Sequence, residues 1–250
     1  MSRRGSRRNR EPDPFDGILL VDKPTGWTSS DVVVKIRNHF KLRKVGHGGT
    51  LDPLATGLLV VLIGKGTKLS DQVMQGDKTY EGTIHLGVTT DSQDRDGTVI
   101  SEKDSSHITQ KRVEKAIQNY LGDIEQIPPM VSAIKKDGVA LYKLARKGKT
   151  VERKPRKIHI YRYDILEFNN PFVRFCVEST KGTYVRTLAH DLGNDLGVGG
   201  SLDALRRTHS GSLDVAQAYS LDHILKQDRS SLGDLMIHLP DVQKTTPKSS

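Results

Sequence analysis

The chain has 250 residues, enough for one large domain or two small ones with a sizeable core. Its formal net charge of +9 and pI near 9.5 favour a polyanionic partner, most simply nucleic acid. A lone cysteine, Cys176, excludes an intramolecular disulfide framework and a cysteine-based zinc site. No apolar run approaches the roughly 18 residues of a membrane span, and no signal-type hydrophobic segment follows the basic N-terminus. We therefore expect a cytoplasmic protein.

The N-terminal elements are predicted from apolar patterning. Residues 1–14 carry five arginines and almost nothing apolar, which predicts a disordered basic tail. The segment 17–21 predicts a buried strand. A capping signal then precedes apolar residues at helical spacing, which predicts a helix over 30–40. The apolar run at 57–63 predicts a second buried strand.

The stretch at 45–60, VGHGGTLDPLATGLLV, holds the single carboxylate of Asp52 between a glycine-rich turn and Pro53. Glycines allow another molecule to approach the backbone closely, and proline biases Asp52 toward an extended conformation. An acidic side chain held rigid beside apolar structure is costly unless it is paired or used. On this stretch alone, an ordinary Asp-Pro turn is the alternative.

The middle of the chain alternates strands and helices without a regular period. Residues 78–88 show the alternation of a half-buried strand, and the acidic residues at 91–96 miss calcium-loop spacing, so we expect a solvated turn there. An amphipathic helix is predicted over 110–121, with these side chains inward: Val113, Ala116, Ile117, Tyr120 and Leu121.

The basic segment 128–157 breaks this pattern and predicts an inserted loop or helical hairpin. A solvated charged face is the alternative, but clustered cations suit contact with phosphates. Beyond it, the segments 158–168 and 172–179 predict an antiparallel hairpin, and a helix follows Gly182. We expect a short helix at 202–208. The fold class is α+β with a largely antiparallel or mixed sheet, because regular strand–helix alternation is missing.

Six collinear segments together resemble the TruB family of tRNA pseudouridine synthases. The resemblance covers roughly residues 15–225, and no single segment is decisive. The segments are GILLVDKPTGWTS (17–29), GHGGTLDPLATGLL (46–59), KTYEGTIHLG (78–87), PPMVSAIKKDGVALYKLARKG (128–148), GTYVRTLAHDLG (182–193) and LDALRRT (202–208).

The resemblance implies the pseudouridine synthase fold, a curved central sheet flanked by helices and loops with an inserted basic thumb at about 128–157. It also implies the reaction, which is isomerisation of the tRNA T-loop uridine at position 55 by base flipping. No cofactor, metal, membrane or obligate protein partner is expected, and a monomer is expected. The catalytic domain spans 15–225, and 226–250 forms a short C-terminal segment without a complete RNA-binding domain of the PUA type.

The resemblance also assigns roles to individual residues. Asp52 is the catalytic aspartate, and Tyr80 stacks on the flipped base. Tyr184 and Arg186 line the pocket, with the arginine facing the aspartate. The other assignments are RNA contact for His47, the pocket wall for Leu202, support for Lys23, and RNA contact from the thumb for Lys143, Arg146, Lys147 and Lys149.

Two departures from the family pattern and several alternatives stay open. Gly199-Gly200-Ser201 stands where the family usually has a polar residue such as histidine before the leucine, and the PUA-type domain is missing. Asp52 could attack C6 or C1′, or promote a glycal-forming elimination. A non-catalytic RNA-binding module and a guide-RNA-dependent synthase that needs partner proteins are the alternative functions.

Overall fold

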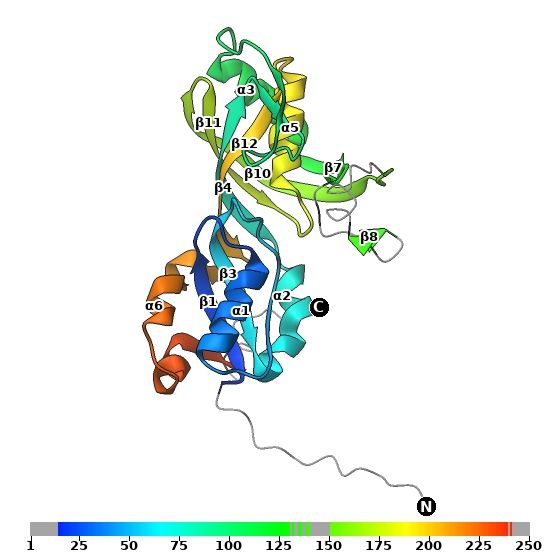
Figure 1. Ribbon diagram of the computed structural model, residues 1–250. Helices are drawn as coiled ribbons and strands as arrows, with labels where there is room; N and C mark the ends of the chain where they lie inside the picture. The colour runs from blue at the N-terminus through cyan, green and yellow to red at the C-terminus, as the bar shows by residue number, and fades with distance from the viewer. Residues whose placement is uncertain are drawn as a thin grey trace, which may run out of the picture.

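A single mixed sheet organises the protein and runs through both of its lobes (Figure 1). The computed structural model describes residues 15–130 and 151–239, together with residues 132, 135, 136, 139, 140 and 241. Within these residues the sheet has 11 strands, in the order β14-β1-β3-β12-β4-β11-β10-β7, with β13, β15 and β2 paired at its sides. The thumb residues Lys143, Arg146, Lys147 and Lys149, and the N-terminal tail, lie outside the described residues.

The lower lobe in Figure 1 is built around two strands that are buried on both faces. Residues of β1 and β3 alternate between two apolar clusters, one under α1 and the other around Val73 of α2. Burial on both faces explains why these strands read as continuous apolar runs. The elements are β1 (Gly17–Lys23), α1 (Ser29–His39), β2 (Val45–His47), β3 (Thr56–Ile63), α2 (Ser70–Gln75), β14 (Tyr219–Ser220), α6 (Leu221–Leu225) and β15 (Met236–His238).

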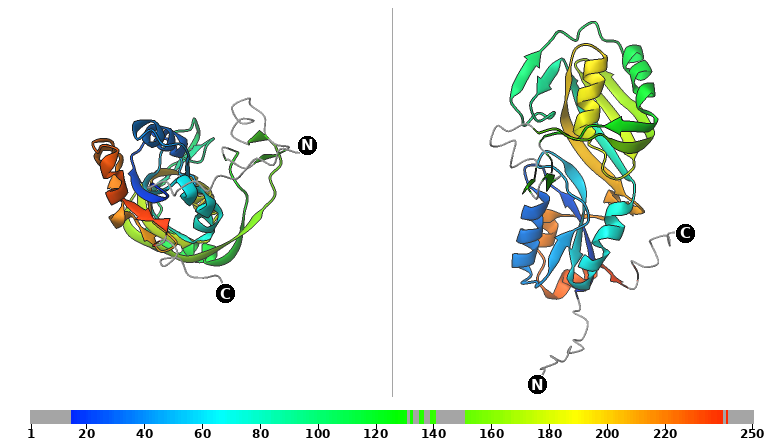
Figure 2. Two further views of the ribbon diagram at one scale, coloured as in Figure 1. Left: turned by 90° about the horizontal axis from the view of Figure 1, so that it is seen from below. Right: turned by 90° about the vertical axis from the view of Figure 1, so that its right-hand side faces the viewer.

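The upper lobe packs helices against one face of an antiparallel sheet (Figures 1 and 2). Its larger elements are β4 (Lys78–Leu86), α3 (Gln110–Ile117), β7 (Gly122–Gln126), β10 (Arg156–Asn169), β11 (Phe172–Ser179), α5 (Val185–Asp195) and β12 (Gly200–Ser210). Shorter strands are β5 (Val88–Thr90), β6 (Val99–Glu102), β8 (Lys135–Lys136), β9 (Val139–Ala140) and β13 (Leu213–Asp214). Strands β4 and β12 continue down into the lower lobe and join the two.

Most predicted elements are confirmed, including the α+β class, the hairpin of β10 and β11, and helix α1. Thr28 and Asp31 form a reciprocal capping box at the start of α1, as the capping signal predicted. The chain leaves β7 at Gln126 and returns in β10 at Arg156, and these two residues are paired across the strands. The base of the thumb is therefore held by regular strand pairing.

Two local predictions are wrong for identifiable reasons. Residues 202–208 form part of β12, not a helix. The pairing register of β12 shifts between Leu202 and Ala204, so Leu202 and Leu205 are both buried. Buried residues three positions apart are typical of a helix, which explains the wrong prediction. Leu121 is not inward but 38% exposed. Helix α3 ends at Ile117, and a 3-10 turn over Gln118–Tyr120 changes the direction of the chain.

Candidate active site

The loop that carries Asp52 connects β2 to β3 and is fixed from both sides. The Gly48 amide donates to the carbonyl of Val60 (2.8 Å). The Ser29 hydroxyl, from the first turn of α1, accepts from the Leu51 amide (2.8 Å) and lies 3.1 Å from the Leu51 carbonyl oxygen. Because these bonds come from two different elements, β3 and α1, they fix the loop on both sides of Asp52.

Lys23, the last residue of β1, contacts the same loop through the carbonyl of Pro53. Its buried ammonium donates to the backbone carbonyls of Pro24 (2.9 Å), Trp27 (2.6 Å) and Pro53 (3.3 Å). Burial lowers the pKa of Lys23 to about 8, while the negative charges of Asp52 and Asp31 raise it. Lys23 does not line the cavity in front of Asp52. The geometry thus gives it a supporting position.

Arg186, in the first turn of α5, faces Asp52. Its Nε lies 2.9 Å from Oδ2 of Asp52, and the arginine side chain is 3% exposed against 39% for the aspartate. Nη1 of Arg186 donates to the carbonyl of Ser92 (2.9 Å). Among the described residues, no group donates a hydrogen bond to Oδ1 of Asp52. One carboxylate oxygen is therefore held by the arginine, and the other is available to a bound molecule.

Asp94 is the exception in the predicted solvated turn at 91–96, where Asp91 and Asp96 are exposed as expected. Its carboxylate is buried, and its Oδ2 lies 3.5 Å from Nε of Arg186. Burial raises the pKa of Asp94, whereas a hydrogen bond from Ser92 and the charge of Arg186 lower it. The Leu202 amide donates to the carbonyl of Gln93, which fastens the turn to β12. The turn therefore contacts Arg186 twice, through the Asp94 carboxylate at Nε and the Ser92 carbonyl at Nη1.

Gln126 was also not foreseen as a site residue. It is buried at the end of β7, and its side-chain amide bonds both backbone groups of Tyr184. Oε1 accepts from the Tyr184 amide (2.8 Å), and Nε2 donates to the Tyr184 carbonyl (3.0 Å). Tyr184 is the N-cap residue of α5. Gln126 therefore fixes the start of the helix that carries Arg186.

Asp52 lines a cavity of about 700 Å³ between the two lobes. Tyr80, Tyr184, Arg186 and Leu205 line it, and the tyrosines are half-buried. Asp52 is the one acidic residue among the described residues of its lining. The basic residues of that lining are Lys78, Arg156, Lys157, Lys181, Arg186 and Arg207.

His47 and Leu202 do not line this cavity. Leu202 is completely buried in the core, and Leu205, three residues on, lies in the cavity wall instead. His47 lies half-buried in β2; burial and the charge of Arg207 lower its pKa, and a backbone hydrogen bond to Gly49 raises it. The structure therefore brings together Asp52, Tyr80, Tyr184 and Arg186 from the predicted set.

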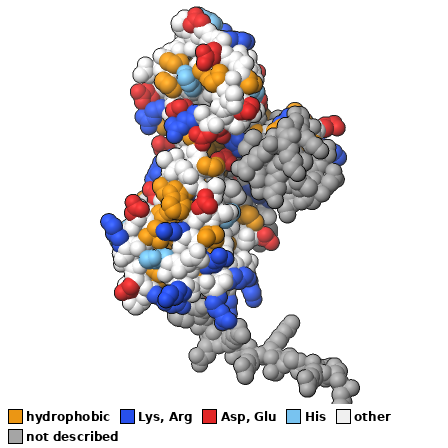
Figure 3. All heavy atoms as spheres, viewed as in Figure 1, with side chains coloured by type: hydrophobic (Ala, Val, Ile, Leu, Met, Phe, Trp, Pro, Cys, Tyr) orange, Lys and Arg blue, Asp and Glu red, His pale blue; other side chains and the backbone are white. Residues whose placement is uncertain are grey.

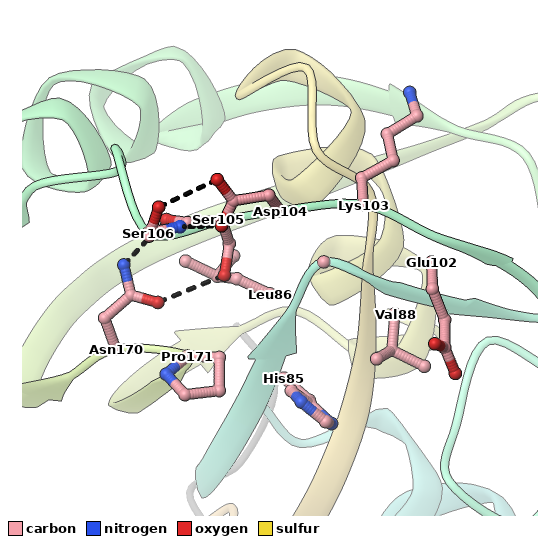
Figure 4. A pocket seen from close by; sticks show the side chains of 11 residues that line it. His85, Leu86, Val88, Glu102, Lys103, Asp104, Ser105, Ser106, Asn170 and Pro171 are labelled. Carbon is pink, nitrogen blue, oxygen red and sulfur yellow. Dashed lines mark hydrogen bonds between the residues drawn. The ribbon is translucent and has the colours of Figure 1, made fainter.

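A second cavity, of about 690 Å³, lies at the end of β4 beside the β10–β11 turn (Figure 4). Its polar side chains bond mainly to one another. The Ser105 hydroxyl donates to Oδ1 of Asn170 (3.1 Å), and Nδ2 of Asn170 donates to the Ser105 carbonyl (2.8 Å). No predicted site residue lines it. We assign this cavity a structural role.

Two family models match adjacent parts of the chain. The model for the "TruB family pseudouridylate synthase (N terminal domain)" matches residues 37–185, and the model for the "tRNA pseudouridylate synthase B C-terminal domain" matches 186–238. The chain is 52% identical to tRNA pseudouridine synthase B of Opitutus terrae over 210 residues, covering 84% of this chain and 87% of the relative. It is 46% identical to the protein of that name from Syntrophotalea carbinolica over 233 residues, covering 93% and 76%.

Solved structures show the same architecture. A chain in the crystal structure of a Cbf5-Nop10-Gar1 complex matches with a TM-score of 0.68 at 30% identity, covering 85% of this chain and 54% of that one. A chain of an H/ACA RNP bound to a substrate RNA containing 2'-deoxyuridine matches with a TM-score of 0.64 at 27% identity, covering 84% and 53%. This chain thus spans little more than half of those chains. Across the described residues, none of the helices combines the length and apolar character that crossing a membrane requires.

Proposed function

The chain belongs to the TruB family of tRNA pseudouridine synthases, and we propose that it isomerises the T-loop uridine at position 55 of tRNA. The observation that carries the proposal is the Asp52–Arg186 ion pair, which lies at a cavity whose other charged side chains are all basic and whose wall includes Tyr80 and Tyr184. A cavity of this charge suits a nucleotide and its phosphates. The reaction needs a carboxylate in the same place.

The target uridine must leave the folded RNA before it can enter this cavity. Everting a nucleotide costs a few kcal/mol of stacking. Stacking on an aromatic side chain recovers about 1–3 kcal/mol per base, and we assign this role to Tyr80, which lines the cavity beside Asp52. Tyr184 forms another part of the wall, held in place by Gln126.

The isomerisation breaks the bond between C1′ and N1 and forms a bond between C1′ and C5. N1 gains a proton, and C5 loses its hydrogen to solvent, so the product has the mass of the substrate. Nε of Arg186 lies 2.9 Å from Oδ2 of the Asp52 carboxylate, and we assign the other oxygen, Oδ1, to the nucleotide. Three first steps of the reaction are compatible with this geometry. Asp52 can attack C1′, attack C6, or remove the 2′ proton with formation of a glycal.

Further parts of the proposal concern RNA contacts and partners. Lys143, Arg146, Lys147 and Lys149 of the thumb are proposed to contact the T-arm, and we propose a further contact with the RNA for Arg156 and Lys157, which line the cavity. Basic side chains also gather on the lower lobe in Figure 3, where Lys35, Arg37, Lys41 and Lys44 are exposed on and after α1. We propose that the protein acts alone, as a monomer.

The test is release of tritium from an unmodified tRNA that carries 5-tritiated uridine at position 55 alone. The purified wild type should release the label stoichiometrically, and Asp52→Asn should release none. Release by both proteins would assign the chemistry to another residue. Binding of the tRNA by the wild type without release would indicate a non-catalytic RNA-binding module or a synthase that needs partner proteins.

A further inference from the structure

Two buried cations on one wall of the cavity are not explained by the Asp52–Arg186 pair. Lys78 begins β4, two residues before Tyr80, and Arg207 lies on the adjacent strand β12. Both line the same cavity as Asp52. Their exposed fractions are 7% and 1%, which is unusual for such residues unless they are paired.

Backbone carbonyls, and not the carboxylates of described residues, accept the hydrogen bonds of both cations. Nε and Nη2 of Arg207 donate to the carbonyls of Leu58 (2.8 Å) and Gly49 (3.4 Å). The ammonium of Lys78 donates to the carbonyls of Met74 (2.8 Å) and Gly76. In the part of the chain that the structure describes, neither cation forms an ion pair with a carboxylate. Arg186, in contrast, lies between two carboxylates.

Hydrogen-bond donors remain for a ligand. An ammonium has three N–H groups and a guanidinium five. Two of those on Lys78 and two of those on Arg207 are used by the backbone. Because the carbonyls fix both side chains, the remaining donors are held in place before a ligand binds, so little entropy is lost on binding.

Burial without a counter-ion is costly, and the neighbouring charges add to the cost. The pKa of Lys78 is lowered to about 8, mainly by burial and in addition by the charges of Arg207 and Lys181. Asp77 acts in the opposite direction. A bound anion would relieve this unfavourable environment. Among the parts of an RNA, only the phosphodiester supplies a full negative charge.

We propose that Lys78 and Arg207 form a subsite for one phosphodiester of the RNA backbone, adjacent to the nucleotide on which Asp52 acts. This inference rests on the proposed function for the identity of the ligand. The subsite would fix the backbone on one side of the everted nucleotide while Tyr80 holds the base. Lys157 and Lys181 also line the cavity but are exposed. They attract the RNA by charge, but they do not hold one phosphodiester in a fixed position as Lys78 and Arg207 do.

The test uses T-arm stem-loop RNAs in each of which one phosphodiester is replaced by a neutral methylphosphonate. Dissociation constants are measured for wild type, Lys78→Met and the control Lys103→Met, an exposed cation outside this cavity. One methylphosphonate beside the target uridine should weaken binding to wild type and Lys103→Met by about tenfold and weaken binding to Lys78→Met by a clearly smaller factor, because only Arg207 then remains at the subsite. Lys78→Met itself should lower the salt slope by about 0.7–0.9.

A second variant, Lys78→Arg, controls for folding and supplies a pH test. A phosphodiester beside Lys78 would raise the pKa of its ammonium above about 8, so binding takes up a proton. The affinity of wild type should then fall as the pH rises through this value. Lys78→Arg should bind at all pH values with little such fall, because arginine stays protonated.

Equal sensitivity of wild type and Lys78→Met to every methylphosphonate would overturn the subsite. The subsite would also be overturned if Lys78→Met lost activity but bound the RNA with the affinity and salt slope of wild type. If wild type binds with the expected coupling but releases no tritium, the subsite stands and the proposed function fails.

Discussion

Replacing Arg186 with methionine tests the central ion pair directly. The substitution keeps much of the aliphatic volume of the side chain and removes the guanidinium. Asp52 then loses its partner at 2.9 Å, and Asp94 loses its partner at 3.5 Å. We expect kcat to fall with little change in KM, because the arginine acts on the carboxylate and makes no predicted contact with the RNA backbone.

The size of the fall follows from the distance and the exposure. Two unit charges 2.9 Å apart interact by ~6 kcal/mol at an effective dielectric constant of about 20. Asp52 is 39% exposed, so solvent screens part of this energy, and we expect a loss of about 2–4 kcal/mol. That energy corresponds to about a 30- to 900-fold fall in kcat.

Single-turnover tritium release with saturating enzyme measures the chemical step. Arg174→Met is the matched control, because Arg174 pairs with Glu167 on the surface and its side chain is 53% exposed. Thermal unfolding of each variant separates a catalytic loss from a loss of folded protein. A rate for folded Arg186→Met within threefold of wild type would refute the assigned role of the pair.

Three further substitutions test the supports of the site. Gln126→Met should destabilise the protein by about 1–3 kcal/mol in urea unfolding and lower activity, since it leaves the Tyr184 amide without its partner, while the Tyr184 carbonyl keeps the amides of Thr187 and Leu188. An unchanged midpoint and rate would contradict the role of Gln126. Burial raises the pKa of Asp94, so the folded state binds the proton more readily than the unfolded chain. The stability of wild type relative to Asp94→Asn should therefore increase as the pH falls from 7 toward 4, and a constant difference would disprove this. Gly57 has a φ of 93°, and a Cβ there would overlap the backbone of Arg207, so Gly57→Ala should cost about 1–3 kcal/mol in the same urea assay, whereas Gly233→Ala, which meets no neighbour, should not.

The sequence was sufficient for elements whose signals are local. Thr28 and Asp31 mark the start of α1, and the apolar runs of β1 and β3 mark buried strands. The sequence was insufficient where contacts between distant segments determine burial or local structure. Asp94 lies among acidic residues before a turn, a pattern typical of solvated loops, and its burial depends on Arg186, far along the chain. A β-bulge in β12 gave Leu202 and Leu205 the spacing of a helix.

The site residues divide in the same way. Asp52, Tyr80, Tyr184 and Arg186 belong to segments that resemble a known family, and the structure places them together. Gln126 ends a short strand and carries no local signal of its bonds to Tyr184. Lys78 and Arg207 come from strands distant in the chain, so only the β4–β12 pairing reveals that they share a wall of the cavity.

The pairing of Gln126 with Arg156 makes the segment between them exchangeable. The chain leaves and re-enters the sheet at neighbouring positions, so the length of the excursion is decoupled from the register of the strands that carry the site. Loop-closure entropy also changes slowly with length. Insertions and deletions in this segment can therefore change its length and charge without shifting the pairing of β7 with β10.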